Sequence, residues 1–346
     1  MKLSELHPIL INKNSCSSEQ EFLLKSIPFF LIKLFIFNKE LLKVKDGLII
    51  GILLIIIVFF QCSKEPGQNK NLPKENNIAL ATPENKNQKP VIHYSLISLK
   101  KDSLFRFNSK TSNDTIKVLL YLNRVDKLHL FRQDTIVVPD TFISNLMVYS
   151  PFPDSISGLK PIHKLIFFSY PIQAFAVYEN GILIRWGPVS MGKESTITPT
   201  GLFHTNWRSK RAISTINRDW IMNWYFNLDN FRGVSMHEYE LPGYPASHAC
   251  IRMIEADALW FYNWADSWML FTPNKIGAYG TPVMIHGAYP FGKRKPWLAL
   301  ADNNKALQMR NEDLTAGIQD YFPLIMERQI ERDSLLSKRK NKFSLK

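Results

Sequence analysis

The sequence predicts a mainly β protein with a helical carboxyl-terminal extension. Short apolar runs bounded by turn residues recur from Val91 onward, as expected of strands. Toward the carboxyl end the apolar positions follow a helical period instead, at Leu314, Ile318, Tyr321 and Ile325. Residues of apolar type make up 45% of the 346 residues. This fraction allows a sizeable core and excludes a wholly disordered chain.

Composition also limits the possible chemistry. Lys and Arg number 43 against 30 Asp and Glu, giving a net charge of +13, which favours polyanions, an anionic membrane or carboxylate-rich substrates. The three cysteines, Cys16, Cys62 and Cys250, are too few for a disulfide scaffold. Neither a Gly-rich phosphate loop nor an HExxH motif occurs, so we expect no metal and no cofactor. No recognition motif accompanies the charge, so we expect no nucleic-acid partner.

The first 61 residues carry an export pattern. Leu48–Phe60 are thirteen uncharged, almost wholly apolar residues, fewer than the ~20 that span a bilayer and suited to a secretory signal. The run stops at Gln61-Cys62 and resembles a bacterial lipoprotein signal, although Gln61 replaces the usual small residue. The resemblance implies a signal segment over 1–61, lipid on Cys62, and a location at the periplasmic side of the cell envelope. The alternative is a plain transmembrane anchor.

Two regions separate this signal from the main domain. Residues 62–90 are rich in Asn, Lys, Pro and Glu, which predicts a flexible tether. Residues 91–160 contain apolar runs that predict a small β-rich module, within which Thr115–Asn123 fits a strand or a helix. Arg124–Pro139 resembles the second half of a LysM glycan-binding module, which implies glycan binding. An ordinary packing subdomain is the alternative.

Strand signals become strongest from Lys164. Two apolar runs meet at Asn180-Gly181, a pair that favours a type I′ hairpin because both turn residues take positive φ. Phe175 and Val177 alternate with their neighbours as a sheet with one buried face requires. We therefore expect a β hairpin here.

A series of motifs follows in a fixed order. They are VSMGK at Val189–Lys193, TPTG at Thr198–Gly201, the histidine His237, SHACIRM at Ser247–Met253, and GTPVMIH at Gly280–His286. In this order they resemble the L,D-transpeptidase (YkuD-like) catalytic domain over residues 164–290. The resemblance implies a β-sandwich or barrel and an enzyme of peptidoglycan biosynthesis that affects cell shape.

Cys250 and two histidines can perform acyl transfer. A cysteine attacks a carbonyl as thiolate, and a nearby imidazole can take its proton and return it to the leaving amine. His248 would lie on the same face as Cys250 if the two share a strand, and His237 would approach it across a loop. Family resemblance makes Cys250 the nucleophile, His237 the base and His248 a supporting residue.

Neighbouring residues are candidates for substrate binding. The resemblance implies that Ser247 shapes the site and that backbone amides at Ala249 and Cys250 bind the oxyanion. Ala249 replaces the usual glycine, and a positive φ there would cost ~1 kcal/mol. Arg252 is expected to bind a substrate carboxylate, with a salt bridge to Asp257 or Glu255 as the alternative.

Other charged and aromatic residues allow two interpretations. Arg208–Arg211 would line the cleft or form a solvated loop, and Trp220, Trp224 and Tyr225 would form a cleft wall or pack in the core. Asp257–Trp268 is expected to be a helix on the sheet. Residues 291–346 are expected to form a helical extension, kinked near Pro323, and a mobile basic tail.

The two resemblances together imply a lipid-anchored enzyme that acts on peptidoglycan stem peptides, which we expect to be a monomer, and the reaction below is the one that the L,D-transpeptidase resemblance implies. Attack on the L,D bond before a terminal D-Ala would form a thioester, and a neighbouring stem amine would then give a 3→3 cross-link. Water as acceptor would give an L,D-carboxypeptidase, and another amine would give exchange or protein anchoring. The rival from another class is a non-catalytic cell-wall-binding lipoprotein.

Overall fold

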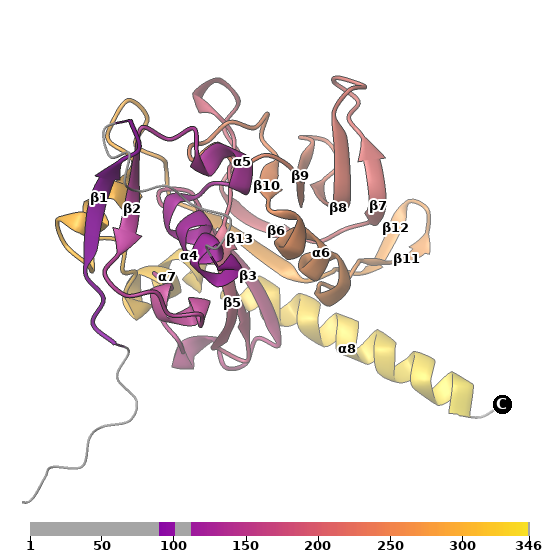
Figure 1. Cartoon of the computed structure of the whole chain (residues 1–346). Helices are drawn as coiled ribbons and strands as arrows, with labels where there is room; N and C mark the ends of the chain where they lie inside the picture. The colour runs from indigo at the N-terminus through magenta and orange to yellow at the C-terminus, as the bar shows by residue number, and fades with distance from the viewer. Residues whose placement is uncertain (1–89, 101–111, 345–346) are drawn as a thin grey trace, which may run out of the picture. The chain divides into compact units, whose positions relative to one another are not determined.

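The computed structural model describes residues 90–100 and 112–344, all within the unit Pro83–Lys346 (Figure 1). The predicted signal segment 1–61, the lipidation site Cys62 and the predicted tether, apart from residue 90, lie outside the described residues. Across the described ranges, no helix combines the length and apolar character needed to cross a membrane.

The amino-terminal module is a mixed α and β unit. Strands β1 (Tyr94–Ser98) and β2 (Thr135–Pro139) pair antiparallel, and helices α4 (Asn113–Asn123) and α5 (Lys127–Leu130) lie between them in sequence. The helical alternative for Thr115–Asn123 is correct, since the Ser112 side chain accepts the Thr115 N–H as an N-cap. The expectation of a β-rich module is wrong to that extent. Two 3₁₀ turns, η1 (Leu146–Tyr149) and η2 (Ser157–Leu159), lead onward.

The first sheet of the main domain has the strand order β5-β4-β3-β13-β6. Its strands are β3 (Lys164–Ser169), β4 (Ala174–Glu179), β5 (Ile182–Pro188), β6 (Gly201–His204) and β13 (Pro282–His286). β13 runs parallel to β3 and antiparallel to β6, and the remaining pairs are antiparallel. The predicted hairpin joins β4 to β5, with φ of 48° at Asn180 and 75° at Gly181.

The second sheet has the order β10-β9-β8-β7. Its strands are β7 (Arg208–Ile213), β8 (Ile221–Asp229), β9 (Val234–Glu238) and β10 (Ile251–Met253). The turn η3 (Glu194–Thr196) precedes this sheet. The helix that was expected over Asp257–Trp268 is α6 (Glu255–Trp264), and it follows the sheet. Beyond it, β11 (Met269–Thr272) pairs with β12 (Lys275–Ala278). The described strands form separate sheets, so the sandwich expectation is met and the barrel alternative is not.

The first sheet is buried on both faces because its strands alternate between two cores. Ile166 and Phe168 belong to the core that it shares with the second sheet, together with Met236 and Ile251. Leu165 and Phe167 belong to the opposite core. That opposite core also contains residues of the module and of the carboxyl-terminal extension, namely Val118, Leu122, Trp297, Leu314 and Ile325.

The carboxyl-terminal extension contains the 3₁₀ helix η4 (Pro296–Ala301), α7 (Asn311–Gln319) and α8 (Phe322–Ser344). The predicted kink near Pro323 is a break between two helices, with Pro323 in the first turn of α8, where its missing N–H costs nothing. The tail that the sequence predicts to be mobile is helical over 337–344, where it continues α8. Lys and Arg favour helix, and this explains the continuation.

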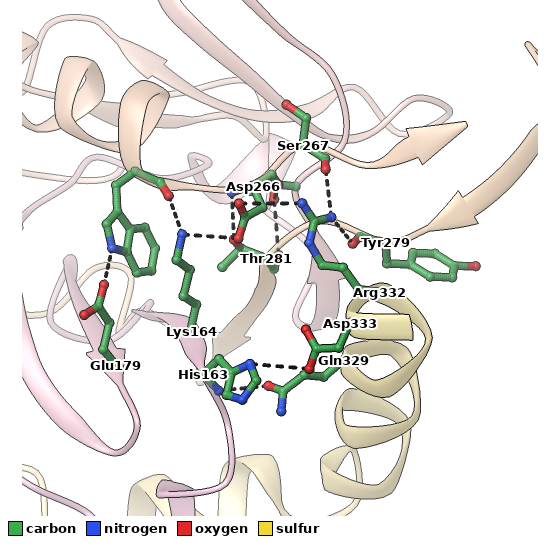
Figure 2. A network of polar contacts seen from close by, with 12 residues as sticks. His163, Lys164, Glu179, Asp266, Ser267, Tyr279, Thr281, Gln329, Arg332 and Asp333 are labelled. Atoms are coloured by element: carbon green, nitrogen blue, oxygen red, sulfur yellow. Dashed lines mark hydrogen bonds and ion pairs between the residues drawn. The ribbon is translucent and has the colours of Figure 1, made fainter. Parts of the chain in front are cut away.

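Polar contacts attach α8 to the main domain (Figure 2). Gln329 accepts the His163 backbone N–H at 2.8 Å, and Asp333 lies 3.7 Å from the His163 ring. Arg332 donates to the carbonyl oxygens of Ser267 at 3.0 Å and Tyr279 at 2.8 Å. These bonds hold the middle of α8 against the residue that precedes β3 and against the segments that flank β11 and β12.

Candidate active site

The register of β9 and β10 brings the predicted base and nucleophile together. The two strands are parallel, with Met236 opposite Ile251 and His237 opposite Arg252. Met236 and Ile251 are buried in the core between the sheets. Because side chains alternate along a strand, Ser235 and His237 face the other way. Both line a cavity of about 240 Å³ that Cys250 and Arg252 also line.

The hydrogen bonding of His237 leaves one ring nitrogen free to act as a base. Its Nδ1 lies 2.8 Å from the Glu238 carbonyl oxygen. A carbonyl oxygen can only accept, so Nδ1 carries the hydrogen and Nε2 keeps a lone pair. The ring is 4% exposed, and this burial lowers the pKa of His237 to about 4. The imidazole is therefore neutral and able to accept a proton at pH 7.

Cys250 is a half-buried free thiol with two polar neighbours. Ser235 Oγ donates to Sγ at 3.2 Å, and Sγ donates to the Gly233 carbonyl oxygen at 3.4 Å. Burial raises the pKa of the Cys250 thiol, while the bond from Ser235 and the charge of Arg252 act in the opposite direction. In the free protein a neutral thiol therefore shares the cavity with a neutral imidazole, and proton transfer must accompany attack on a substrate.

The backbone before Cys250 is held by side chains of two predicted motifs. Ser247 Oγ donates to the Cys250 carbonyl oxygen. Thr196 Oγ1 donates to the Ser247 carbonyl at 2.9 Å, and Thr198 Oγ1 donates to the Ala249 carbonyl at 3.0 Å. The φ of Ala249 is 74°, so the strain expected for alanine in place of glycine is present. Thr198 is the first residue of the TPTG segment, and its bond explains why that segment belongs to this site.

His248 lines the same cavity, but the strand argument that placed it there is wrong. β10 begins at Ile251, and the positive φ of Ala249 turns the chain between His248 and Cys250. The His248 ring lies against Trp220, with centroids 4.8 Å apart. Burial, with the charges of Lys193 and Arg252, lowers the pKa of His248. His248 therefore forms part of the cavity wall.

Arg252 lines the cavity without the alternative salt bridge to Asp257. Its guanidinium lies over the Tyr239 ring at 4.6 Å, and its backbone exchanges two 3.0 Å hydrogen bonds with Ser190. Asp257 is fully buried and binds Arg185 at 2.6 Å instead. Arg252 thus keeps the cavity-facing position predicted for a carboxylate-binding residue.

The remaining wall comes mainly from the hairpin of β7 and β8, where the sequence left a cleft wall and core packing as alternatives for the aromatic residues. Of these two interpretations, the cleft wall holds for Tyr225 and Trp220, whereas Trp224 packs against Tyr262 with centroids 5.6 Å apart. The Arg208–Arg211 cluster does not line the cavity, and Arg208 lies over the Tyr262 ring at 4.9 Å. Ser235 was missed, although its place two residues before His237 could have indicated a shared face.

The site is thus a cysteine and a histidine on adjacent strands of a mainly β domain. The family model of the L,D-transpeptidase catalytic domain, YkuD, matches residues 163–285. The match covers the residues whose motifs predicted this resemblance, and it confirms the resemblance for this part of the chain.

Solved structures of similar fold include several L,D-transpeptidases. That from Mycobacterium smegmatis has 20% identity over 36% of this chain and 59% of its own, with a TM-score of 0.29. That from Stackebrandtia nassauensis has 18% identity over 37% of this chain and 57% of its own, with a TM-score of 0.30. Each match spans less than two thirds of the other protein. A search of curated proteins found no match.

Proposed function

We propose that this chain is a cysteine-dependent L,D-transpeptidase acting on peptidoglycan stem peptides, with Cys250 as nucleophile and His237 as general base. The observation that supports this most is the parallel register of β9 and β10, which turns both residues toward one cavity. The free Nε2 of His237 supports the base role, because it can accept the thiol proton while Nδ1–H is held by Glu238.

The reaction would proceed through a thioester. Sγ of Cys250 attacks the carbonyl carbon of the L,D bond before a terminal D-Ala, and its proton moves to Nε2 of His237. The backbone N–H groups of Ala249 and Cys250 stabilise the oxyanion, each donor being worth ~3 kcal/mol. The tetrahedral intermediate then collapses, the C–N bond breaks, and His237 returns the proton to the departing amine of D-Ala.

The acyl acceptor determines the product. A neighbouring stem amine gives a 3→3 cross-link, which is the product we propose. Water gives the L,D-carboxypeptidase, and other amines give exchange or protein anchoring. Arg252 would bind a stem-peptide carboxylate as a bidentate partner. Ser247 and His248 complete the site as structural neighbours of Cys250.

We further propose that the enzyme is a monomer attached to the envelope membrane by lipid on Cys62. The module over 91–160, with its LysM resemblance, would help it engage the wall. These proposals rest on sequence features, and mass measurement of the processed amino terminus tests the lipid directly.

Incubation with tetrapeptide-bearing muropeptides tests the activity. We expect the wild-type chain to produce dimers and Cys250→Ala to produce none, as followed by mass spectrometry. Tripeptide monomers without dimers would indicate the carboxypeptidase. If neither product nor a carbapenem adduct on Cys250 forms, the non-catalytic wall-binding protein is favoured and the proposal fails.

A further inference from the structure

The loop 239–247 connects the strand of the base to the nucleophile, and the amino-terminal module holds its first half. Val125, just after α4, forms an antiparallel bridge with Pro242. The Asp126 backbone N–H donates to the Leu241 carbonyl oxygen at 3.0 Å. Because the loop ends at Ser247, three residues before Cys250, its anchoring influences where the thiol lies.

The Asp126 carboxylate binds the loop and its own helix at once. Its Oδ2 accepts the Leu241 backbone N–H at 2.8 Å. Its Oδ1 accepts the His129 backbone N–H at 2.8 Å, which makes Asp126 the N-cap of α5. Leu241 is fully buried, so its N–H would lose its partner in a place that water does not reach if this carboxylate were removed.

A second contact lies one residue further along the loop. Gln133 Nε2 donates to the Pro242 carbonyl oxygen at 3.2 Å. At Gly243, φ is +81°, and a Cβ there would lie 2.9 Å from Val125 Cγ1 and 3.1 Å from Gln133 Oε1. The loop therefore approaches the module as closely as a glycine permits.

The part of the module that makes these contacts is itself tightly fixed. The buried side chain of Asn123 donates to the carbonyl oxygens of Leu119 at 3.0 Å and Val137 at 2.9 Å, and accepts the Val137 N–H at 2.7 Å. These bonds tie the end of α4 to β2. A core between α4, α5 and β2 lies behind them, formed by Leu119, Val125, Leu130, Ile136 and Val138.

The second half of the loop is attached to the catalytic domain next to the nucleophile. Ser190 Oγ donates to the Tyr244 carbonyl at 2.7 Å and accepts the Ala246 N–H at 3.2 Å. The Ser190 backbone pairs with Arg252. The loop is thus fixed at one end by the module and at the other by the strand region that carries the site.

We propose that the amino-terminal module positions the active site, with Asp126 as the positioning residue that holds the loop before Cys250. Its carboxylate sets the loop conformation in which the thiol, Ser235 and His237 face the same cavity. The effect on acylation rests on the proposed function, whereas the effect on the loop itself does not.

The test compares Asp126→Asn with Asp134→Asn in the full-length chain. Asn has one acceptor oxygen, so it cannot serve both Leu241 and His129. Asp134 lies in the same module, but its side chain is exposed in an ion pair with Lys100. Gln133→Met is a second, milder variant that removes the bond to Pro242. Thermal unfolding checks that each variant is folded.

Three measurements are made on each protein. Hydrogen exchange reports the protection of the Leu241 amide. Mass spectrometry follows carbapenem acylation of Cys250 and, separately, its alkylation by iodoacetamide as a function of pH. Cleavage after Arg232 and Arg252 isolates Cys250 in a peptide with no other cysteine.

For Asp126→Asn we expect Leu241 exchange to be about tenfold faster, carbapenem acylation about tenfold slower, and a shifted alkylation profile. Gln133→Met should change the same quantities less, and Asp134→Asn should match wild type. Unchanged exchange and an unchanged alkylation profile in folded Asp126→Asn would overturn the proposal. If wild-type Cys250 takes no carbapenem, the proposed function fails, and exchange with alkylation still decides the role of Asp126.

Discussion

The two walls of the cavity at the candidate active site are built differently. One wall is the segment from Tyr239 to Cys250, which is bonded on one side to the module and on the other to Ser190. The other wall is the tip of the β7–β8 hairpin, residues 214–220. Its bonds are internal, such as Ser214 N–H to the Trp220 carbonyl at 3.0 Å, and its Ile216 is 74% exposed.

From this contrast we expect the bonded wall to position the reacting groups and the hairpin wall to bind the substrate. Catalytic groups must be held within a fraction of an ångström, and the bonded wall provides that. The hairpin wall presents apolar side chains with few buried contacts, so it can open at a smaller free-energy cost. The ring contact between Trp220 and His248 joins the two walls. Changes on the bonded wall should therefore alter the chemical step, and changes on the hairpin should alter binding.

The largest expected effect comes from His237→Gln in β9, the strand that leads into the bonded wall. Gln is close in size to His but cannot accept the thiol proton as a general base. We expect carbapenem acylation of Cys250 at pH 7 to fall by about 10²–10⁴-fold. Raising the pH should reduce the difference in acylation rate between wild type and His237→Gln, because the thiolate then forms without a base. Acylation rates from pH 6 to 10 measure both effects.

His163→Gln is the matched control, since this half-exposed histidine contacts α8 outside the cavity. It should match wild type across the pH range. A gap between His237→Gln and wild type that stays constant with pH would contradict the base role.

The second effect is a loss of stability in acid. His237 has a pKa of about 4 when folded because it is buried, against about 6.5 when unfolded. Between these two pKa values the unfolded state binds more protons than the folded state. The contribution of neutral His237 to the free energy of unfolding is therefore complete above pH 6.5 and is lost as the pH falls toward 4. The loss amounts to about 3 kcal/mol, and urea unfolding at several pH values measures it.

Comparison with His237→Gln isolates this contribution. Burial also lowers the pKa of His204 to about 3 and raises that of Asp257 to about 6, and the latter has the opposite effect on stability. Both groups are present in wild type and variant, so the difference between the two curves belongs to His237. Parallel curves would show that His237 is not the group responsible.

The sequence predicted the bonded wall better than the hairpin wall, for a physical reason. The motifs at Thr198–Gly201 and Ser247–Met253 are local, and side chains in them bond to backbone close in sequence: Thr198 accepts the Gly192 N–H and Ser247 donates to the Cys250 carbonyl. Ala249 stood out because it replaces the usual glycine, and its φ in the structure is 74°. Likewise, the pair Asn180-Gly181 predicted the hairpin turn from its own two residues, and both have a positive φ in the structure.

Features set by distant pairing were not predictable in this way. The parallel register that puts His237 opposite Arg252 depends on packing of the whole second sheet. Trp220 and Trp224 look alike in sequence, yet one lines the cavity and the other packs on Tyr262. The contact of Asp126 with Leu241 joins residues 115 positions apart, which no periodicity reveals.

Trp220→Ala tests the hairpin wall. Trp220 is half-buried and contributes ring area to the cavity, so its loss should weaken substrate binding by about tenfold, seen as a higher KM with a smaller change in kcat. Trp224→Ala is the paired control, because its ring lies outside the cavity and packs against the core. It should lower Tm and leave KM near wild type. A fall in kcat with KM unchanged in Trp220→Ala would assign the hairpin to the chemical step.

The smallest effect expected is a gain in stability on the bonded wall. Ala249→Gly removes the strain of a non-glycine residue at φ 74°, worth about 1 kcal/mol. This should raise Tm by about 2–4 °C. Ala246→Gly, three residues earlier and without a positive φ, should lower Tm, because glycine there only adds freedom to the unfolded chain. Differential scanning calorimetry measures both shifts. If both substitutions lower Tm, the strain at Ala249 is already relieved by its surroundings, and the carbonyl bond from Thr198 is the contact to change next.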